Sequence, residues 1–512
     1  MHNSVTPRFM SPGAHYLAII LTVLWAYGGG LDMCLNSTSL ITIASGLHET
    51  HTFVAQAFFW RPLANYVSRI LYAGFGINPV PYHILALIMH SLNALLVYHI
   101  ATKLSKDGIV ALMAGLMFAA FYRHAGLLFG SGLFYEYGYA FLCLVAIVTF
   151  QHFQDTKRPV YLAVSLSSLF VALLLKESAI AAFPLIVALD QFYRPHPLPR
   201  VRWKLILCLA GVGVVYFALR MHFVSSSAGG TPVWLNSMKA PGVYKTFKQM
   251  YKGLYITIAN VCPGKDMSGI FYLGFILFIW KAVRYRRLAV TAGTLVIISV
   301  LPLLYGAGPT NRYLYFSTAF SVIFLAVVIR YSVVALTDRI LSPYAGVGTG
   351  LVTGTILLLI VSLNIHKVHN LEVMYREASC LHRSNLEDIV TAFPNGTKNF
   401  RLFLINTPIN LPRSHGGIQI WEGGINVKYI LSLFYEEPNS IGEVIQLTTD
   451  LGYPVPTNQE KISMRTSNKE LDNISQDPKN KVLVFNPYTK HLEDKTGKTS
   501  QEIRMAIENI RN

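Results

Sequence analysis

The sequence predicts a polytopic α-helical membrane protein with about eleven transmembrane helices and a C-terminal soluble α/β domain. Three observations support this fold class. Long apolar segments alternate with short connectors rich in lysine and arginine. Of the 512 residues, 53% are hydrophobic and only 13% are charged, whereas roughly 25% are charged in an average soluble protein. The composition also turns polar after His369.

A helix that crosses the hydrocarbon core needs about 17–25 residues. The segments that meet this requirement are 14–31, 79–102, 108–123, 133–152, 159–175, 177–193, 203–222, 267–283, 288–306, 310–334 and 344–366. The basic connectors are typical of cytoplasmic loops, which places the N-terminus inside and everything after 367 outside. The net charge of +17 lies largely in these connectors, so it indicates orientation and argues against a nucleic-acid partner.

Two outer connections are long. The first, 32–78, contains WRPLANYVSRILYAGF at 60–75, which predicts a helix lying in the membrane interface or dipping into it. The second, 223–266, carries spaced aromatic residues and lysines that predict another surface helix. Together with the spans, these loops make up a predicted transmembrane module over 1–369.

The tail, 370–512, is predicted to form a small α/β domain outside the cytoplasm. Apolar runs at 401–405 and 482–485 predict strands, and 499–510 has a helical pattern. A length of about 140 residues suits a domain that folds independently. Cys34, Cys262 and Cys380 would all fall on the outer side, so one disulfide among them stays open.

Ionisable and polar residues outside the basic connectors gather at the outer ends of the spans. A charge inside a bilayer is costly, so such clustering predicts one polar site at one membrane surface. The residues concerned are Asp32, Arg61, His83, His90, Asn93, Arg123, His124, Glu136, Lys176, Glu177, Arg312 and Tyr313. Several have a structural alternative: Glu136 could simply pair with Arg123, and His83 and His90 could be packing residues on one helical face.

One carboxylate with several cations at a membrane surface suits a lipid-linked phosphate sugar. Arginine and lysine would neutralise the departing phosphate, and the carboxylate would act as general base on an acceptor hydroxyl. The sequence has no P-loop and no GxGxxG motif, so we expect no directly bound nucleotide. It has no histidine, cysteine and acidic cluster with metal spacing, so we expect neither metal nor cofactor.

Four motifs carry a family resemblance: WRPLANY (60–66), NPVPYHILALIMHSLNALLVY (78–98), LLLKESAIAAFPLIVALD (173–190) and TNRYLYFS (310–317). Over roughly 15–365 the chain resembles the membrane module of the GT-C glycosyltransferases. The most similar branch contains the O-mannosyltransferases with transmembrane and tetratricopeptide-repeat regions, and their bacterial relatives. The resemblance implies a polyprenyl-phosphate-sugar donor, inversion at the anomeric carbon, and a catalytic acid at the start of the first outer loop.

On that basis Asp32 takes the role of general base. Arg61, Lys176, Arg312 and Tyr313 match the RPL, KE and RY motifs and are assigned to the donor phosphate or the scaffold around it. The remaining polar residues are assigned supporting roles. The chain departs from the family pattern in two places. Asp32 has Leu31 beside it and Glu49 as the next acid, where relatives carry paired acids, and FYRHAGLLFG lacks the usual proline and glutamate.

The leading hypothesis is a mannosyltransferase-like membrane enzyme that moves a sugar to a protein hydroxyl, a lipid or a surface glycan. Its partners would be the lipid-linked donor, the surrounding lipids and this acceptor. The alternatives are a lipid or glycan transporter or flippase, and an inactive scaffold whose outer domain binds a partner. The expected location is a bacterial cytoplasmic membrane with the C-terminal domain outside, or the endoplasmic reticulum membrane in a eukaryote.

Overall fold

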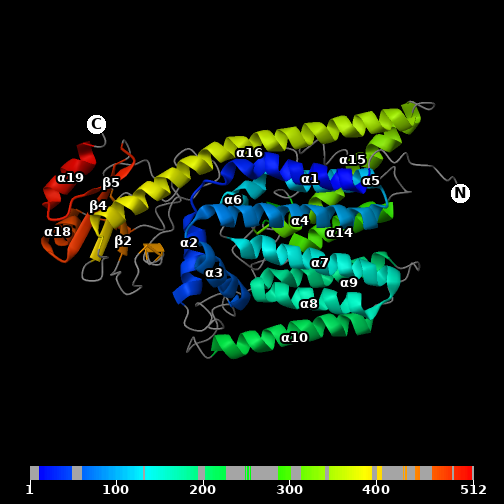
Figure 1. Cartoon of the computed structure of the whole chain (residues 1–512), viewed down its shortest axis with the longest axis horizontal. Helices are drawn as coiled ribbons and strands as arrows, with labels where there is room; N and C mark the ends of the chain where they lie inside the picture. The colour runs from blue at the N-terminus through cyan, green and yellow to red at the C-terminus, as the bar shows by residue number, and fades with distance from the viewer. Residues whose placement is uncertain are drawn as a thin grey trace.

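The computed structural model is a bundle of roughly parallel helices with a small β-sheet at one end (Figure 1). It describes residues 11–48, 60–130, 133–193, 202–225, 248, 251–252, 254, 286–300, 313–340, 345–394, 401–405, 430–431, 433–434, 444–449, 464–466, 468–486 and 489–509. The predicted span 267–283, most of the loop 223–266, Glu49, Arg312 and Cys262 lie outside these residues.

Local sequence signals begin and end the helices of the first half of the bundle. These helices are α1 (Pro12–Tyr27), α4 (Pro79–Ser105), α5 (Gly108–Ala120), α7 (Phe134–Thr156) and α8 (Pro159–Leu175). Three of them start at a proline. Proline suits the first helical position because an N–H at that position would have no acceptor within the helix, so nothing is lost by its absence. The Asp107 carboxylate caps α5 by accepting from the main-chain nitrogens of Ile109 and Val110. Lys106 and Lys157 take left-handed conformations that end α4 and α7.

The second half of the bundle contains α10 (Trp203–Ser225), α14 (Arg286–Val300), α15 (Tyr315–Ile340) and α16 (Ala345–Ala392). Within the described residues, six helices are long and apolar enough to cross a membrane, in agreement with the predicted polytopic membrane protein. They are Pro79–Ser105, Gly108–Leu128, Phe134–Thr156, Trp203–Phe223, Tyr315–Thr337 and Gly346–Ala392.

The predicted span 177–193 differs from a regular transmembrane helix. It consists of the 3-10 turn η3 (Glu177–Ala181) followed by α9 (Ala182–Phe192), which has 11 residues. At 1.5 Å per residue α9 is about 16 Å long, against a hydrocarbon core of about 30 Å. Pro184 contributes to the irregular start because it has no N–H to donate to the turn before it.

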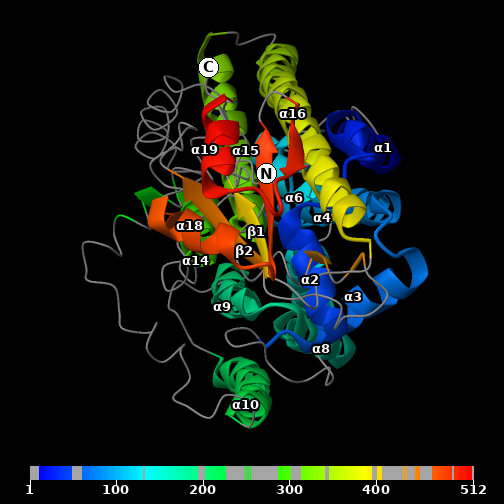
Figure 2. The same cartoon turned by 90° about the vertical axis from the view of Figure 1, so that its left-hand side faces the viewer.

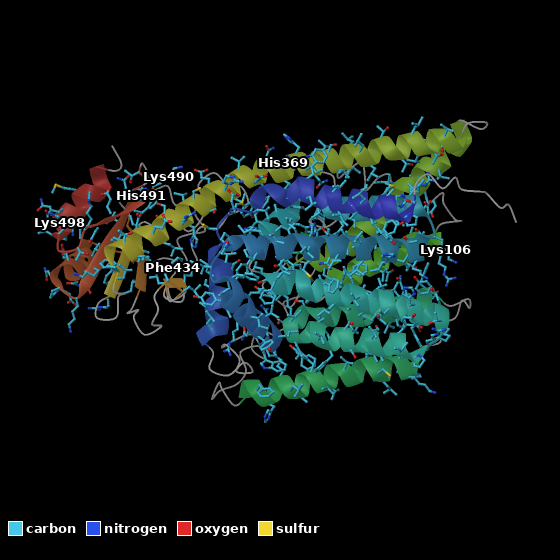
Figure 3. The ribbon with its side chains drawn as sticks, in the orientation of Figure 1. Lys106, His369, Phe434, Lys490, His491 and Lys498 are labelled. Atoms are coloured by element: carbon cyan, nitrogen blue, oxygen red, sulfur yellow. The ribbon has the colours of Figure 1, made fainter. Side chains whose placement is uncertain are left out.

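Two helices of the first outer loop lie at the sheet end of the bundle. The segment 60–75 contains α3 (Pro62–Phe75), which confirms the helix predicted there. A second helix, α2 (Ser37–His48), was not predicted. In Figure 3, Lys106 lies at the end of the bundle far from Lys490, His491 and Lys498 of the sheet region. The basic connector at Lys106 and the long loop therefore lie at opposite ends, as the sequence predicts.

Helix α16 corrects the predicted end of the last span. We expected the helix to end near residue 366, but it continues to Ala392 without a break. Apolar side chains continue at helical spacing beyond the span, and Ala378, Leu381 and Ile389 are buried. The change in composition after His369 therefore marks a change in what the helix contacts, and the division into domains at that point stays a prediction.

The tail forms a five-stranded sheet in the order β3-β2-β1-β4-β5. The strands are β1 (Arg401–Ile405), β2 (Val444–Thr449), β3 (Met464–Thr466), β4 (Asn480–Asn486) and β5 (His491–Asp494). Helix α18 (Asn468–Gln476) lies between β3 and β4 in the chain, and α19 (Ser500–Asn509) follows β5. Only the pairing of β4 with β5 is antiparallel among these strands. The expected strands at 401–405 and 482–485 and the final helix are present in β1, β4 and α19.

The sheet lies between two helical layers, as Figure 2 shows. Leu402 and Leu404 of β1 pack with α16 and α2, whereas Phe403 and Ile405 pack with α18 and α19. This alternation explains why RLFLI is apolar throughout, since a strand buried on both faces needs no polar side. Asp388 of α16 accepts from the main-chain nitrogen of Leu492 at 2.7 Å, so the sheet is attached to the same helix that runs along the bundle.

Candidate active site

Asp32 lies in the connection that follows α1, after the 3-10 turn η1 (Gly28–Gly30). The glycines permit a close approach that side chains would block. A Cβ on Gly30 would lie 2.5 Å from the ring of Phe129, and one on Gly29 would collide with the Glu372 carboxylate of α16. The glycine run therefore brings the loop that carries Asp32 directly against α16.

The partner of Asp32 is Arg376 of α16. Its Nη1 donates to Asp32 Oδ2 at 2.6 Å, and its Nη2 donates to the Gly29 carbonyl at 2.6 Å and to Glu372 Oε1 at 3.3 Å. The hydrogen bond from Arg376 lowers the pKa of the Asp32 carboxyl below its ordinary value. Asp32 is therefore held in the ionised form that a general base requires.

His83 of α4 supports the loop just beyond Asp32. It is buried, and its Nε2 donates to the carbonyl oxygen of Met33 at 2.9 Å. This contact gives His83 a structural role in placing Asp32.

A second group, which we call the charge cluster, consists of Arg61, Glu136, Lys176 and Glu177. Arg61 binds Glu177 through two hydrogen bonds of 2.7 and 3.1 Å. The Lys176 ammonium donates to both carboxylate oxygens of Glu136. The expectation that Glu136 pairs with Arg123 is therefore corrected.

Tyrosine rings join the two ion pairs. Tyr135 lies 5.1 Å from the Arg61 guanidinium and 5.9 Å from the Lys176 ammonium, measured to the ring centroid. The ring of Tyr313 lies 4.4 Å from the same ammonium. Cation–π contacts of this kind stabilise a cation within about 6 Å of a ring. The predicted RPL, KE and RY motifs thus meet at one place, through Arg61, Lys176 and Tyr313.

Breaks in regular structure put these side chains at the helix ends. Arg61 precedes Pro62, which starts α3 and keeps Arg61 itself outside the helix. Lys176 has an extended backbone between α8 and η3, with φ −159° and ψ 132°. Glu136 lies in the first turn of α7, where the positive end of the helix dipole favours a carboxylate.

His90 and Asn93 belong to a buried network that anchors the start of α15. His90 Nε2 donates to the Ala119 carbonyl at 3.2 Å, so its Nδ1 accepts from the Tyr315 hydroxyl at 2.7 Å. Asn93 donates to the same hydroxyl at 3.2 Å. His90 and Asn93, which were predicted to share one helical face, therefore both bind the Tyr315 hydroxyl. Tyr315 lies two residues after Tyr313 of the charge cluster region.

His124 and Arg123 lie near this network but have other neighbours. The His124 ring lies 4.6 Å from Tyr315 and 5.2 Å from His90, and neither of its buried ring nitrogens has a hydrogen-bond partner among the described residues. The Arg123 guanidinium lies 5.2 Å from the ring of Tyr122, and the Lys367 ammonium of α16 lies 4.8 Å from the same ring.

The structure therefore separates the predicted residues into groups. Arg61, Glu136, Lys176, Glu177 and Tyr313 come together, whereas the ion pair of Asp32 is with Arg376. Sequence reasoning missed Arg376 and Glu372, although their spacing of four residues, typical of a helical ion pair, was a usable signal. Within the described part of the chain, no three histidine, cysteine or acidic residues lie close enough to hold a metal ion.

Two solved structures share the helical membrane fold of this chain. ArnT from Cupriavidus metallidurans bound to undecaprenyl phosphate aligns over 94% of both chains, with a TM-score of 0.53 and 11% identity. The apo state of the same enzyme aligns over 93% of both chains, with a TM-score of 0.50 and 12% identity. The chain thus has a fold like that of ArnT. No family model matches the sequence, and no curated protein sequence matches it.

Proposed function

We propose that this protein is a membrane glycosyltransferase that moves one sugar from a polyprenyl-phosphate donor to an acceptor outside the cytoplasm. The observation that carries the proposal is a fold like that of ArnT with a carboxylate just after α1 and η1, at the bundle end that bears the charge cluster. The structure of ArnT that shares this fold contains undecaprenyl phosphate. The acceptor class is a protein hydroxyl, a lipid or a surface glycan.

The proposed reaction is a single displacement at the anomeric carbon. Asp32 accepts the proton of the acceptor hydroxyl while the acceptor oxygen attacks that carbon. The bond to the phosphate oxygen breaks, and the polyprenyl phosphate leaves with the electron pair. One displacement inverts the configuration of the sugar. Arg376 keeps Asp32 ionised, and because the pair is exposed an acceptor can approach the carboxylate.

The charge cluster limits which of its residues can bind the donor phosphate. Its two cations are already neutralised by two carboxylates. Lys176 and Glu136 are fully buried. If a phosphate replaced Glu136 as the partner of Lys176, the Glu136 carboxylate would be left unpaired in the interior. Arg61 and Glu177 are more exposed, at 16% and 33%. We therefore assign phosphate binding to Arg61, together with Arg312, and a scaffold role to Lys176 with Tyr313.

The internal neutrality of the cluster also favours one second candidate, the inactive scaffold. In that case Arg61 and Lys176 would only hold helices together, and the sheet would bind a partner. The substitution Asp32→Asn separates the two functions, because it removes the base while keeping the shape of the side chain. We expect transfer activity to fall by about 100-fold or more in Asp32→Asn.

The test compares cells with and without the protein by mass spectrometry of their glycans and lipid-linked sugars. The glycosyltransferase predicts that one glycan disappears and its lipid-linked donor accumulates without the protein, and that Asp32→Asn gives the same result. Asp155→Asn is the matched control, because Asp155 is an exposed carboxylate that pairs with Lys103. A glycan and donor pool that do not change without the protein would refute the transferase, and full activity of Asp32→Asn would exclude Asp32 as the base.

A further inference from the structure

Two cysteines from distant parts of the chain lie on segments that contact each other at the sheet end of the bundle. Cys34 follows Asp32 in the first outer loop, and Cys380 is in α16. Both carry free thiols. The main-chain nitrogen of Cys34 donates to Oγ of Ser379 at 2.7 Å, and Ser379 directly precedes Cys380. The loop is therefore hydrogen-bonded to α16 beside the second cysteine.

Two contacts define the register of the loop along α16, one at Asp32 and one at Cys34. Asp32 pairs with Arg376 at 2.6 Å. Cys34 is two residues further along the loop, which is up to about 7 Å of extended chain. Cys380 is four residues further along the helix, about one turn or 6 Å. The two advances are similar, and the contact of Cys34 with Ser379 leaves Cys380 at the next position of the helix. A disulfide there would hold the two Cα atoms about 4.4–6.8 Å apart.

The electrostatics of Cys34 agree with this register. Burial has the largest effect and raises the pKa of the Cys34 thiol; Ser379 and Arg383 lower it, and Cys380 raises it. Cys380 is exposed, whereas Cys34 is only partly so. Cys380 is thus the thiol that a reaction partner from solution would meet first.

We propose that Cys34 and Cys380 are a modification site at which a disulfide fastens the Asp32 loop to α16. The oxidant is a disulfide-bearing oxidase or small-molecule disulfide of the outer compartment. The Cys380 thiolate attacks that disulfide and releases one of its sulfurs as a thiolate. The Cys34 thiolate then attacks Cys380 in the mixed disulfide and releases the other. Two protein thiols are oxidised, the partner becomes a dithiol, and the two thiol protons pass to its thiolates.

The disulfide has a consequence for Asp32. An exposed ion pair such as Asp32 with Arg376 is worth little by itself, so it holds the loop weakly. A covalent bond two residues away restricts the loop without occupying the carboxylate. The inference depends on the outward placement of this end in the proposed function, because disulfides persist mainly outside the cytoplasm.

The experiment uses the full-length protein in its native membrane, with free thiols blocked by N-ethylmaleimide during lysis. We expect mass spectrometry of the digest to find one linked peptide that joins Cys34 to Cys380 and disappears on reduction. In Cys34→Ser, Cys380 should become alkylated without reduction. Cys208→Ser is the matched control, because Cys208 is an exposed thiol on α10, and it should leave the linked peptide unchanged.

Alkylation of both Cys34 and Cys380 in the unreduced wild type would overturn the inference, as would a peptide that joins either residue to Cys262. Detection of the linked peptide does not depend on sugar transfer, so the disulfide and the proposed function are tested independently. Transfer activity without the linked peptide would refute the disulfide alone. The linked peptide in an inactive protein would refute the transferase alone.

Discussion

The two charged regions at the sheet end of the bundle differ in burial. The side chains of Lys176 and Glu136 are 2% and 0% exposed, whereas those of Asp32 and Arg376 are 69% and 42% exposed. A buried pair cannot lose one partner without leaving an unpaired charge. An exposed pair contributes about 0–1 kcal/mol and can exchange partners with solvent or substrate. Of the two regions, the exposed one is thus suited to chemistry and the buried one to support.

The largest effect is expected at the buried pair. Lys176→Met leaves the Glu136 carboxylate without its partner and should lower the free energy of unfolding by about 3–5 kcal/mol. Thermal or denaturant unfolding of the purified protein in detergent measures this loss. The matched control is the double variant Lys176→Met with Glu136→Leu, which removes both charges and should recover most of the stability. A single variant as stable as the wild type would contradict the supporting role.

The double variant also tests the assignment of the phosphate. If Lys176 only supports the site, the double variant should keep measurable transfer activity once its stability is restored. Complete loss of activity in a folded double variant would show that Lys176 acts on the donor, and would reverse our division between Arg61 and Lys176.

An intermediate effect is expected at Arg61 and Glu177, whose burial lies between the other two pairs. Glu177→Gln should cost about 1–3 kcal/mol of unfolding free energy. It should also strengthen binding of undecaprenyl phosphate several-fold, because the phosphate no longer competes with a carboxylate for Arg61. Native mass spectrometry with added lipid measures this binding. Weaker binding in Glu177→Gln would contradict phosphate exchange at Arg61.

The smallest effect is expected at Arg376. Arg376 lowers the pKa of Asp32, so Asp32 stays ionised to lower pH and activity is lost only as the pH falls through this lowered pKa. Arg376→Gln should raise the pKa towards its ordinary value and move the acid limb of the activity profile to higher pH. The unfolding free energy should change by less than about 1 kcal/mol. If the acid limb does not move, Arg376 does not control the pKa of Asp32 in the active enzyme.

The sequence was sufficient for much of the fold because hydropathy and capping are local signals. The starts of α4, α5 and α8 follow from Asn78, Asp107 and Pro159, and the apolar run of β1 follows from its burial on both faces. The end of α16 could not be predicted in this way. Its second half is polar on one side and packs on β5, whose Leu492 lies 104 residues after its partner Asp388.

The candidate site was only partly accessible from the sequence. The RPL, KE and RY motifs meet as the resemblance implies, through Arg61, Lys176 and Tyr313. The partners of the charged residues were less predictable. Glu136 pairs with Lys176 and Asp32 pairs with Arg376, and both contacts join residues far apart in the chain. Burial, which distinguishes their roles, depends on packing that no single segment encodes.

The 48 residues of α16 extend over about 72 Å as one helix. This helix packs against the bundle, carries Arg376, and is attached to the sheet through Asp388. A force that displaces the sheet relative to the bundle must therefore either bend α16 or shift Arg376 against Asp32. A macromolecule captured by the sheet would in this way alter the basicity of a carboxylate that it never touches.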